Sequence, residues 1–335
     1  MPLPRSQGKD GEWTGGNVPL ADVVPQAVAA PAPRLLTDNA SDTLRGIALV
    51  VLANLIWTLG DATAKLVLPS IGVAAAMLWR GVFGMATVAA VTMARPDATG
   101  WRRLMPRRWG LVLARSALSS FVSVTWYISW LSMSLADTYA VGFIAPLIMT
   151  VLAIPMLGER IRWRRALSTL VGFGGVLIML RPGGDLWTPV VLLLLAGTVV
   201  MALTRIMTRQ LTVTETPECQ AFWLLIGHTL TGLLLLPAFP GSGAVGMTGW
   251  FALAFLGLSS GLAHCVFARG YALGPVSALA PYEYTIMPWG VLAGFLVFGD
   301  LPSWSTLAGA AVVAAAGSYN VYRERVRRAE ERAAG

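Results

Sequence analysis

Charged residues are scarce in this chain. Only 13% of its 335 residues are Asp, Glu, Lys or Arg, whereas 56% are hydrophobic and the mean hydropathy is +0.65. A soluble domain typically carries about 25% charged residues. This shortage excludes a water-soluble domain of this length and predicts an integral membrane protein.

Cysteine and histidine are also rare. Cys219 and Cys265 form no CxxC or Cys/His pattern, so we expect neither a disulfide framework nor a metal site, and small side chains facing lipid or core. His228 and His264 have no Glu or Cys at metal-ligand spacing, and we expect hydrogen bonds from a neighbouring helix. The chain also lacks a Ser/His/Asp order and a Gly-rich phosphate loop. We therefore expect no cofactor, no metal and no catalytic residue, and a protein that is not an enzyme.

The net charge of +8 comes from arginines grouped between apolar runs, not spread along one face. A nucleic-acid partner requires a basic stripe or patch, so no nucleic-acid partner is expected. Grouped Lys and Arg are instead typical of the cytoplasmic loops of membrane proteins.

Long apolar runs dominate the rest of the sequence. A membrane-spanning helix needs about 20 mostly apolar residues. Ten such helices, separated by short turns rich in Gly and Pro, are predicted near residues 44–68, 71–94, 109–131, 136–157, 165–181, 187–209, 217–239, 248–272, 275–298 and 304–322. The predicted fold is an all-α membrane protein with the lipid bilayer as its solvent.

Two short stretches of the sequence are nearly the same. Gly158-Glu159 is followed by Trp163, and Gly299-Asp300 is followed by Trp304, which gives an offset of 141 residues (299 − 158 and 304 − 163). Each follows one predicted helix and precedes a Gly/Ala-rich one. Five predicted helices separate the copies, and an odd number of crossings inverts the second copy. An inverted repeat is typical of secondary transporters.

The repeat divides the chain into four parts. We expect a disordered cytoplasmic N-terminal tail at 1–43, a first five-helix repeat at 44–182, a second at 187–322 and a basic cytoplasmic C-terminal tail at 323–335. Arginines concentrate in alternate loops and in the C-terminal tail, which places both termini in the cytoplasm.

The fifth and tenth predicted helices are rich in small residues, including Gly172, Gly174, Gly175 and Gly309. Small residues let helix backbones approach closely in lipid. We expect these two helices to serve as scaffold or dimer helices, which leaves a homodimer open.

An ionisable side chain inside a membrane span is costly and usually marks a pathway or a fixed ion pair. Glu283 is the strongest candidate, about eight residues into its helix and flanked by prolines that loosen the backbone. It would bind substrate or accept a proton, or else form a structural ion pair with Arg80 or Arg115. Arg80 would bind an anionic group or pair with a carboxylate.

Asp61 and Lys65 lie four residues apart on one helix face. This spacing allows them to neutralise each other near the outer interface, and a role in the pathway is the alternative.

Four aromatic residues lie too deep in their predicted helices for the interfacial belt, namely Trp57, Trp126, Tyr282 and Trp289. They would either line a cavity for a flat or cationic ligand, by stacking or cation–π contact, or pack in the core.

The chain resembles EamA-type transporters of the drug/metabolite transporter superfamily across about residues 44–326. The resemblance rests on short motifs in both halves, chiefly Leu55-Ile56-Trp57, Leu78-Trp79-Arg80, Ala145-Pro146, Leu157-Gly158-Glu159-Arg160, Arg209-Gln210-Leu211, Ala268-Arg269-Gly270-Tyr271-Ala272, Leu279-Ala280-Pro281-Tyr282-Glu283-Tyr284-Thr285 and Val297-Phe298-Gly299-Asp300-Leu301-Pro302. The motifs of the second half resemble a proteobacterial branch that includes riboflavin, S-adenosylmethionine and metallophore transporters. Asp300 departs from the Glu usual at its position.

The resemblance implies two EamA repeats around a central cavity in the cell inner membrane. The function expected is secondary transport of a small polar or aromatic metabolite, such as a vitamin or amino-acid derivative, by alternating access. The alternatives are an intramembrane enzyme or lipid-modifying protein, which would need paired catalytic residues at one interface, and a non-transporting membrane scaffold.

Overall fold

A computed structural model describes most of the chain. The described residues are 40–94, 100–157, 163–180, 188–239, 241, 245–300, 302–312, 315, 316, 319 and 322. They all belong to one compact unit, Asp38–Gly335. The first 39 residues of the expected N-terminal tail, the Gly158-Glu159 turn and the tail from residue 323 lie outside the described residues.

Every regular element in the described ranges is helical. The elements are α1 (Ala40–Met93), η2 (Gly100–Leu104), α2 (Trp109–Trp130), α3 (Leu135–Gly142), α4 (Ile144–Leu157), α5 (Trp163–Leu180), α6 (Pro189–Leu211), α7 (Pro217–Leu235), α8 (Met247–Leu273), α9 (Val276–Leu279), the 3₁₀ turn η3 (Ala280–Thr285), α10 (Ile286–Ala293) and the π turn η4 (Gly294–Phe298). The expected all-α fold is confirmed.

Local sequence explains where several helices begin. Thr188 and Thr216 each accept a hydrogen bond from a backbone N–H three residues on, and each is followed by a proline at the first helical position. A Thr side chain satisfies a free N–H at a helix start, and proline there has no N–H to satisfy. Ser134 caps α3 in the same way through the N–H of Asp137.

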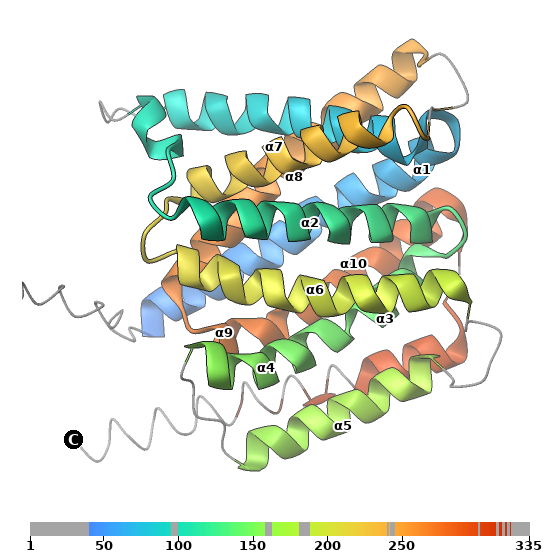
Figure 1. Cartoon of the computed structure of the whole chain (residues 1–335). Helices are drawn as coiled ribbons and strands as arrows, with labels where there is room; N and C mark the ends of the chain where they lie inside the picture. Colours follow the sequence, from blue (N-terminus) through green and yellow to red (C-terminus); the bar gives the residue numbers. More distant parts are fainter. Residues whose placement is uncertain are drawn as a thin grey trace, which may run out of the picture. The chain divides into compact units, whose positions relative to one another are not determined.

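Helix α1 contains the first two predicted helices. At 54 residues it would measure roughly 80 Å if straight, far beyond a bilayer core of about 30 Å. Pro69 removes a helical hydrogen bond, and Gly72 adopts φ 77°, a conformation that L side chains rarely adopt. The chain turns back there into two arms, residues 40–71 and 73–93 (Figure 1).

Two predicted helices are broken. The segment predicted at 136–157 is interrupted at Phe143, between α3 and α4. The segment predicted at 275–298 passes through α9, η3, α10 and η4. At the repeat offset of 141 residues, the end of η3 at Thr285 corresponds to residue 144, where α4 begins. Broken helices let side chains and backbone carbonyls line a buried cavity in a membrane protein.

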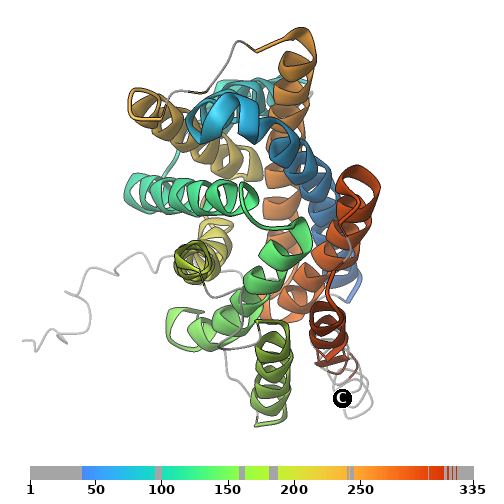
Figure 2. The ribbon, with the colours of Figure 1, turned by 90° about the vertical axis from the view of Figure 1, so that its right-hand side faces the viewer.

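The closest helix contacts join the two halves of the chain. Helix α1 packs against α8 and α7, and α2 packs against α6 and α7. Helix α6 lies between α2 and α4, as the two perpendicular views agree (Figures 1 and 2). A space at the centre of this packing is therefore lined from both halves.

Small residues allow the tightest of these contacts. A Cβ added at Gly261 of α8 would lie 2.6 Å from the carbonyl oxygen of Gly84 on α1, and one at Gly257 would lie 2.4 Å from the Phe83 side chain. This is the small-xxx-small spacing that brings membrane helices together. Gly309 likewise approaches Gly175 of α5, where a Cβ would lie 2.4 Å from the carbonyl oxygen, so the expected close approach through small residues is confirmed.

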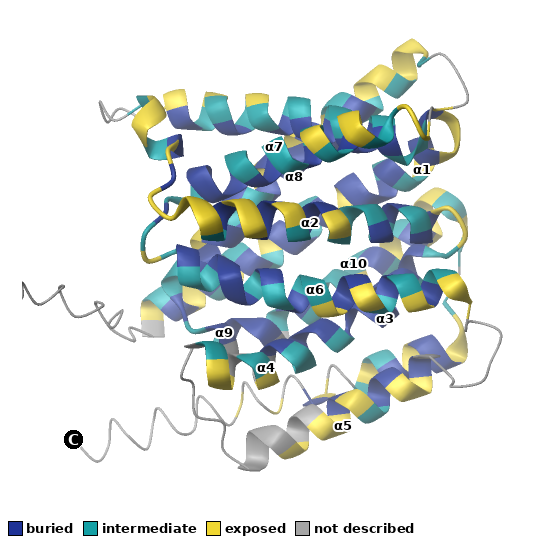
Figure 3. Cartoon of the chain, in the orientation of Figure 1, coloured by how far each residue is buried: buried dark blue, intermediate teal, exposed yellow. Residues whose placement is uncertain are grey.

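Four described helices are long and apolar enough to cross a membrane, namely Ser41–Met93, Trp109–Trp130, Pro189–Leu211 and Met247–Leu273. Large apolar side chains are exposed on outward faces, while the inward faces are buried (Figure 3). Helix α5 exposes Leu167, Leu170, Phe173 and Ile178. Such apolar surfaces suit lipid, and they mark the chain as a multi-pass membrane protein.

Candidate functional site

A cavity of about 120 Å³ lies among α1, α2, α3, α4, α6, α7, α8 and η3. Its charged lining residues are three arginines and two carboxylates: Arg80, Arg115, Arg205, Asp61 and Glu283. Charged groups this deep among apolar helices are expected to serve a pathway.

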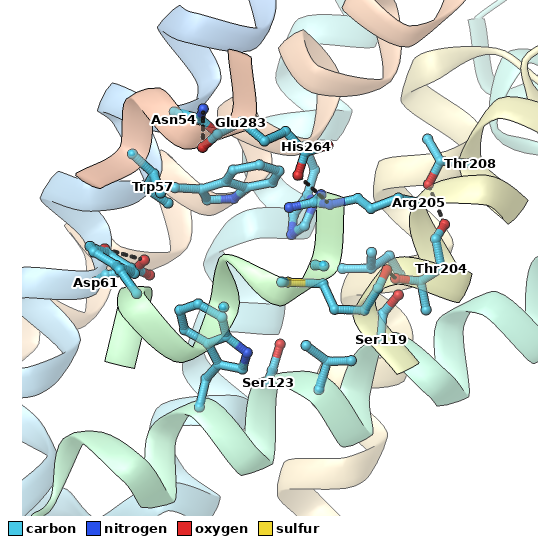
Figure 4. Close-up of a pocket in the computed structure, with 18 of the residues that line it drawn as sticks. Asn54, Trp57, Asp61, Ser119, Ser123, Thr204, Arg205, Thr208, His264 and Glu283 are labelled. Carbon is cyan, nitrogen blue, oxygen red and sulfur yellow. Dashed lines mark hydrogen bonds and ion pairs between the residues drawn. The ribbon is translucent and has the colours of Figure 1, made fainter. Parts of the chain in front are cut away.

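Helical periodicity places the lining residues. On the first arm of α1, Asn54, Trp57 and Asp61 follow one another at spacings of three and four, so they share one face of the helix. On α6, Met201, Arg205 and Thr208 have the same spacing. Figure 4 shows these two faces opposite each other across the cavity.

Glu283 forms an ion pair with Arg205. The Arg205 Nε lies 3.3 Å from the Glu283 Oε2, and the Tyr271 hydroxyl donates a hydrogen bond to the Glu283 Oε1. The two side chains are 16% and 9% exposed, and Figure 4 shows them reaching toward each other. Both carboxylate oxygens are therefore engaged, one by a cation and one by a phenol. We call Glu283, Arg205 and Tyr271 the Glu283 cluster.

The backbone that carries Glu283 is held by Asn54. The Asn54 Nδ2 donates to the carbonyl oxygens of Tyr282 at 3.1 Å and Glu283 at 3.3 Å, and to the Thr285 Oγ1 at 3.0 Å. The Glu283 carbonyl also accepts a hydrogen bond from the Ile286 N–H, and the Tyr282 carbonyl one from the Thr285 hydroxyl, so Asn54 adds a second donor from another helix. One amide from α1 thus anchors the segment that presents Glu283.

The Arg205 guanidinium also rests on aromatic rings. Its central carbon lies 4.7 Å from the Trp57 ring centroid and 4.1 Å from the Phe267 centroid. Phe267 in turn stacks on Tyr271, with ring centroids 4.4 Å apart. A guanidinium is planar and weakly hydrated, so it stacks on aromatic faces more readily than an ammonium does.

Asp61 lies apart from the Arg205–Glu283 pair (Figure 4). The Tyr139 hydroxyl donates to the Asp61 Oδ2 at 2.8 Å, and among the described residues no ion pair joins Asp61 to a cation.

The predicted Asp61–Lys65 neutralisation is wrong. The Lys65 Nζ instead lies 3.1 Å from the Asp300 Oδ2 and 4.7 Å from the Phe298 ring centroid, because the break after α10 brings Asp300 back beside α1. We call Asp61 and Tyr139, with Arg80 and Tyr127 beside them, the Asp61 cluster.

Arg80 and Arg115 have neutral hydrogen-bond partners. Arg80 donates to the Ser260 Oγ at 2.8 Å and the Tyr127 hydroxyl at 3.1 Å. Arg115 donates to the Thr208 Oγ1 at 2.8 Å and to the Gln220 carbonyl oxygen at 3.1 Å. The hypothesis that Glu283 pairs with either arginine is therefore wrong, since Arg205 takes that place.

The two histidines line the same cavity, with ring centroids 6.2 Å apart. The His228 ring nitrogen Nε2 lies 3.1 Å from the Ser123 Oγ on α2, so the expected hydrogen bond to a neighbouring helix is confirmed for His228. The His264 ring packs edge-on against Trp57, with centroids 5.1 Å apart. Trp126 and Trp130 also line the cavity, and their buried indole N–H groups have no hydrogen-bond partner among the described residues.

The structure brings five of the eight candidate residues into one cavity: Glu283, Arg80, Asp61, Trp57 and Trp126. The other three lie outside the lining. Lys65 pairs with Asp300, Tyr282 packs against the core around Trp57, and Trp289 belongs to α10.

The sequence analysis missed Arg205, Asn54 and Tyr271. Arg205 carried a usable signal, because it is a charged residue one turn inside an apolar span. Asn54 carried none, because a polar residue near a helix middle does not reveal partners more than 200 residues along the chain. Tyr271 carried none either, because a tyrosine near a helix end is typical of the interfacial belt.

Metal-binding groups do not gather in the described part of the chain, where no three His, Cys, Asp or Glu side chains come together. Both cysteines are buried, as expected for core-facing residues. What this site offers a ligand is charge of both signs, aromatic faces and hydrogen-bond donors.

A multi-pass helical protein with a buried, charged cavity between its halves has the architecture of a membrane transporter. Residues 44–181 match the EamA-like transporter family, so this part of the chain is an EamA domain of the drug/metabolite transporter superfamily. A crystal structure that is 20% identical matches 87% of this chain and 99% of its own with a TM-score of 0.65. This likeness shows the same fold over most of the chain.

Named relatives come from proteobacteria. The S-adenosylmethionine uptake transporter of Rickettsia bellii is 26% identical over 64% of this chain and 72% of its own length. The riboflavin transporter of Vibrio cholerae is 32% identical over 50% of this chain and 56% of its own, and that of Rhizobium johnstonii is 28% identical over 79% and 85%. The chain is a membrane transporter.

Proposed function

We propose that the chain is an inner-membrane secondary transporter of a small metabolite that combines polar groups with a flat ring. The cavity between the halves is the substrate site. Residues 44–182 and 187–322 are the two inverted repeats of five helices, both termini are cytoplasmic, and the repeats move against each other in alternating access.

The Arg205–Glu283 ion pair inside the cavity is the observation that carries this proposal. A buried ion pair is weak evidence for stability, because desolvation offsets most of the Coulomb attraction. Its position on the wall of a cavity lined from both halves therefore favours a role in binding or coupling. A scaffold would have no use for charges there.

The cavity volume favours a closed conformation. Ligand pockets typically hold about 300–1,000 Å³, and this cavity holds about 120 Å³. A metabolite with a ring system therefore requires the lining helices to separate. The breaks at Phe143 and in η3 lie side by side, with the rings of Phe143 and Tyr284 5.0 Å apart, and offer points at which the halves bend.

The relatives support the class of substrate. Several are named for uptake of S-adenosylmethionine and others for transport of riboflavin. Both metabolites contain a flat nitrogen heterocycle, which suits the aromatic and hydrogen-bonding lining. The sequence carries no ATP-binding motif, so we propose that transport runs on an ion gradient, on exchange or downhill.

Reconstitution in proteoliposomes tests the proposal. Riboflavin and S-adenosylmethionine are the first substrates to measure, followed by a comparison of all metabolites between cells lacking and cells overproducing the protein. We expect saturable uptake of at least one metabolite, and reduced uptake by Glu283→Gln. Asp42→Asn is the matched control, because Asp42 is an exposed carboxylate on α1 outside the cavity.

The same vesicles test coupling. If Glu283 accepts a proton, uptake by the wild type changes with pH and uptake by Glu283→Gln does not. Wild-type kinetics that stay constant across pH would remove Glu283 from proton coupling, and a failure of every metabolite to accumulate or leave would overturn the proposal of transport.

A further inference from the structure

We infer that the Arg205 guanidinium occupies a binding site for a planar cationic group of the substrate, and that the substrate displaces it. The site consists of the Trp57 and Phe267 rings and the Glu283 carboxylate. The inference rests on the proposed transport function for the identity of the ligand, but not for the existence of the site.

Arg205 makes the contacts that a bound planar cation would make. Its guanidinium lies against two ring faces, 4.7 Å from the Trp57 centroid and 4.1 Å from the Phe267 centroid, and pairs with the Glu283 Oε2 at 3.3 Å. Aromatic faces combined with a carboxylate are the chemistry that recognises cations in binding sites. A side chain of the protein here takes the position of a ligand.

The walls of this site are built independently of Arg205. Trp57 and Phe267 contact each other, with ring centroids 4.9 Å apart, and Tyr271 holds both Phe267, by stacking, and the Glu283 Oε1, by its hydroxyl. Asn54 fixes the backbone of Glu283. The rings and the carboxylate therefore keep their places when the guanidinium leaves.

The charges in the cavity favour exchange of one cation for another. With Arg205 in place, three guanidiniums face two carboxylates, the other members being Arg80, Arg115 and Asp61. When Arg205 withdraws, two charges of each sign remain. A cationic substrate that replaces Arg205 restores the original sum and keeps Glu283 in an ion pair, whereas an anion would leave Glu283 without a cationic partner.

Arg205 is able to withdraw. Its side chain is 16% exposed to the cavity and rotates about four bonds, whereas its ring partners are buried. Because Arg205 competes for the site, weakly binding cations are excluded and the carboxylate is never left unpaired. This makes Arg205 a specificity-determining residue, which the sequence motifs did not single out.

Three probes of the same shape test the inference: benzamidinium, benzamide and benzoate, which carry a positive, a zero and a negative charge. Binding to the purified full chain in detergent is measured by calorimetry. In Arg205→Ala we expect benzamidinium to bind about tenfold more tightly than in the wild type, equivalent to about 1.4 kcal/mol. The affinities for benzamide and benzoate should not increase in Arg205→Ala. The double variant Arg205→Ala/Glu283→Gln should lose the increased affinity for benzamidinium.

Folding is controlled separately. Arg205→Ala leaves a buried carboxylate without a cation, so we expect its melting temperature to fall below that of the wild type. Methylguanidinium should restore part of the lost melting temperature, whereas methylammonium should not. Arg205→Lys keeps the charge without the planar face, and benzamidinium should displace the lysine more easily than the arginine.

Two results would overturn the inference. One is an Arg205→Ala variant that is folded but binds benzamidinium no more tightly than the wild type does. The other is an increase in the affinity of Arg205→Ala for benzoate that equals or exceeds the increase for benzamidinium. That result would assign the site to anions bound through Arg80 and Arg115. Neither measurement depends on transport, so a failed uptake assay and a failed binding assay are distinguishable.

Discussion

The cavity holds two carboxylates that accept a hydrogen bond from a tyrosine hydroxyl, yet they are placed differently. Glu283 lies on a broken helix and is paired with a guanidinium. Asp61 lies on a regular stretch of α1, and its bond from Tyr139 is its only described hydrogen bond, while the neighbouring Arg80 is held by Ser260 and Tyr127. In the Glu283 cluster the two opposite charges form an ion pair, whereas in the Asp61 cluster Asp61 and Arg80 are each hydrogen-bonded to neutral groups.

The backbone differs as well. Two carbonyls of η3 accept hydrogen bonds from Asn54 on another helix, so packing between the halves helps to set the position of Glu283. Asp61 keeps its place through the helical hydrogen bonds of α1. Movement of the halves would therefore displace Glu283 more than Asp61, and we expect the Glu283 cluster to respond more strongly to substitution.

The largest effect is expected from Glu283→Gln. It leaves Arg205 as an uncompensated buried charge, which costs about 3 kcal/mol of unfolding free energy. Adding Arg205→Met removes that charge and keeps an apolar contact with the rings, so the double variant should recover most of the loss. Thermal unfolding in detergent measures both. A double variant less stable than the single one would contradict the charge balance.

Asn54→Leu is expected to lower the free energy of unfolding by a smaller amount, about 2 kcal/mol. The change removes, at nearly constant volume, the Asn54 donor from the Thr285 hydroxyl and from two η3 carbonyls, which keep their hydrogen bonds from the Thr285 hydroxyl and the Ile286 N–H. Hydrogen exchange should increase in η3 and stay unchanged in the Asp61 cluster. Equal increases at both places would show that Asn54 does not act on η3 alone.

Asp61→Asn should lower the free energy of unfolding by about 1 kcal/mol or less. The amide oxygen still accepts the hydrogen bond from Tyr139, and the partners of Arg80 are unchanged. Uptake should fall by a smaller factor than in Glu283→Gln. If Asp61→Asn is the more damaging substitution, the order of the two clusters is reversed.

The smallest effect is expected from Lys65→Met. The Lys65–Asp300 pair has side chains 15% and 37% exposed, and partly exposed ion pairs contribute about 0–1 kcal/mol. Asp300→Asn should change the free energy of unfolding as little as Lys65→Met does. The effects of Asp61→Asn and Lys65→Met should add when the two substitutions are combined. Strong coupling between Asp61 and Lys65 would revive the helix-face pairing that the structure contradicts.

Long apolar runs predicted the positions of the helices well, because hydrophobic length is a local property. The run at 109–131 differs from α2 by one residue at its end, and the run at 248–272 differs from α8 by one residue at each end. The breaks in 136–157 and 275–298 were less visible. Prolines flank Glu283, which marked its segment as loosened. Gly142 and Pro146 flank Phe143 in the same way, but the apolar run continues across them and was predicted as one helix.

Site residues were predictable where one ionisable side chain stands in an apolar run. Glu283, Asp61 and Arg80 were found in this way. Their partners were not, because Arg205, Tyr139 and Tyr271 come from other helices, and the helix spacing rule finds only neighbours on the same helix. For Asp61 that rule named Lys65, which the structure pairs with Asp300.

Composition and hydropathy by themselves determined that this is a helical membrane protein, where its helices run and which few charges lie at depth, because lipid imposes these demands on each segment separately. Tertiary structure alone decided which charges meet. It paired Glu283 with Arg205 and Asp61 with Tyr139, since partner choice depends on how helices from the two halves pack and not on distance along the chain.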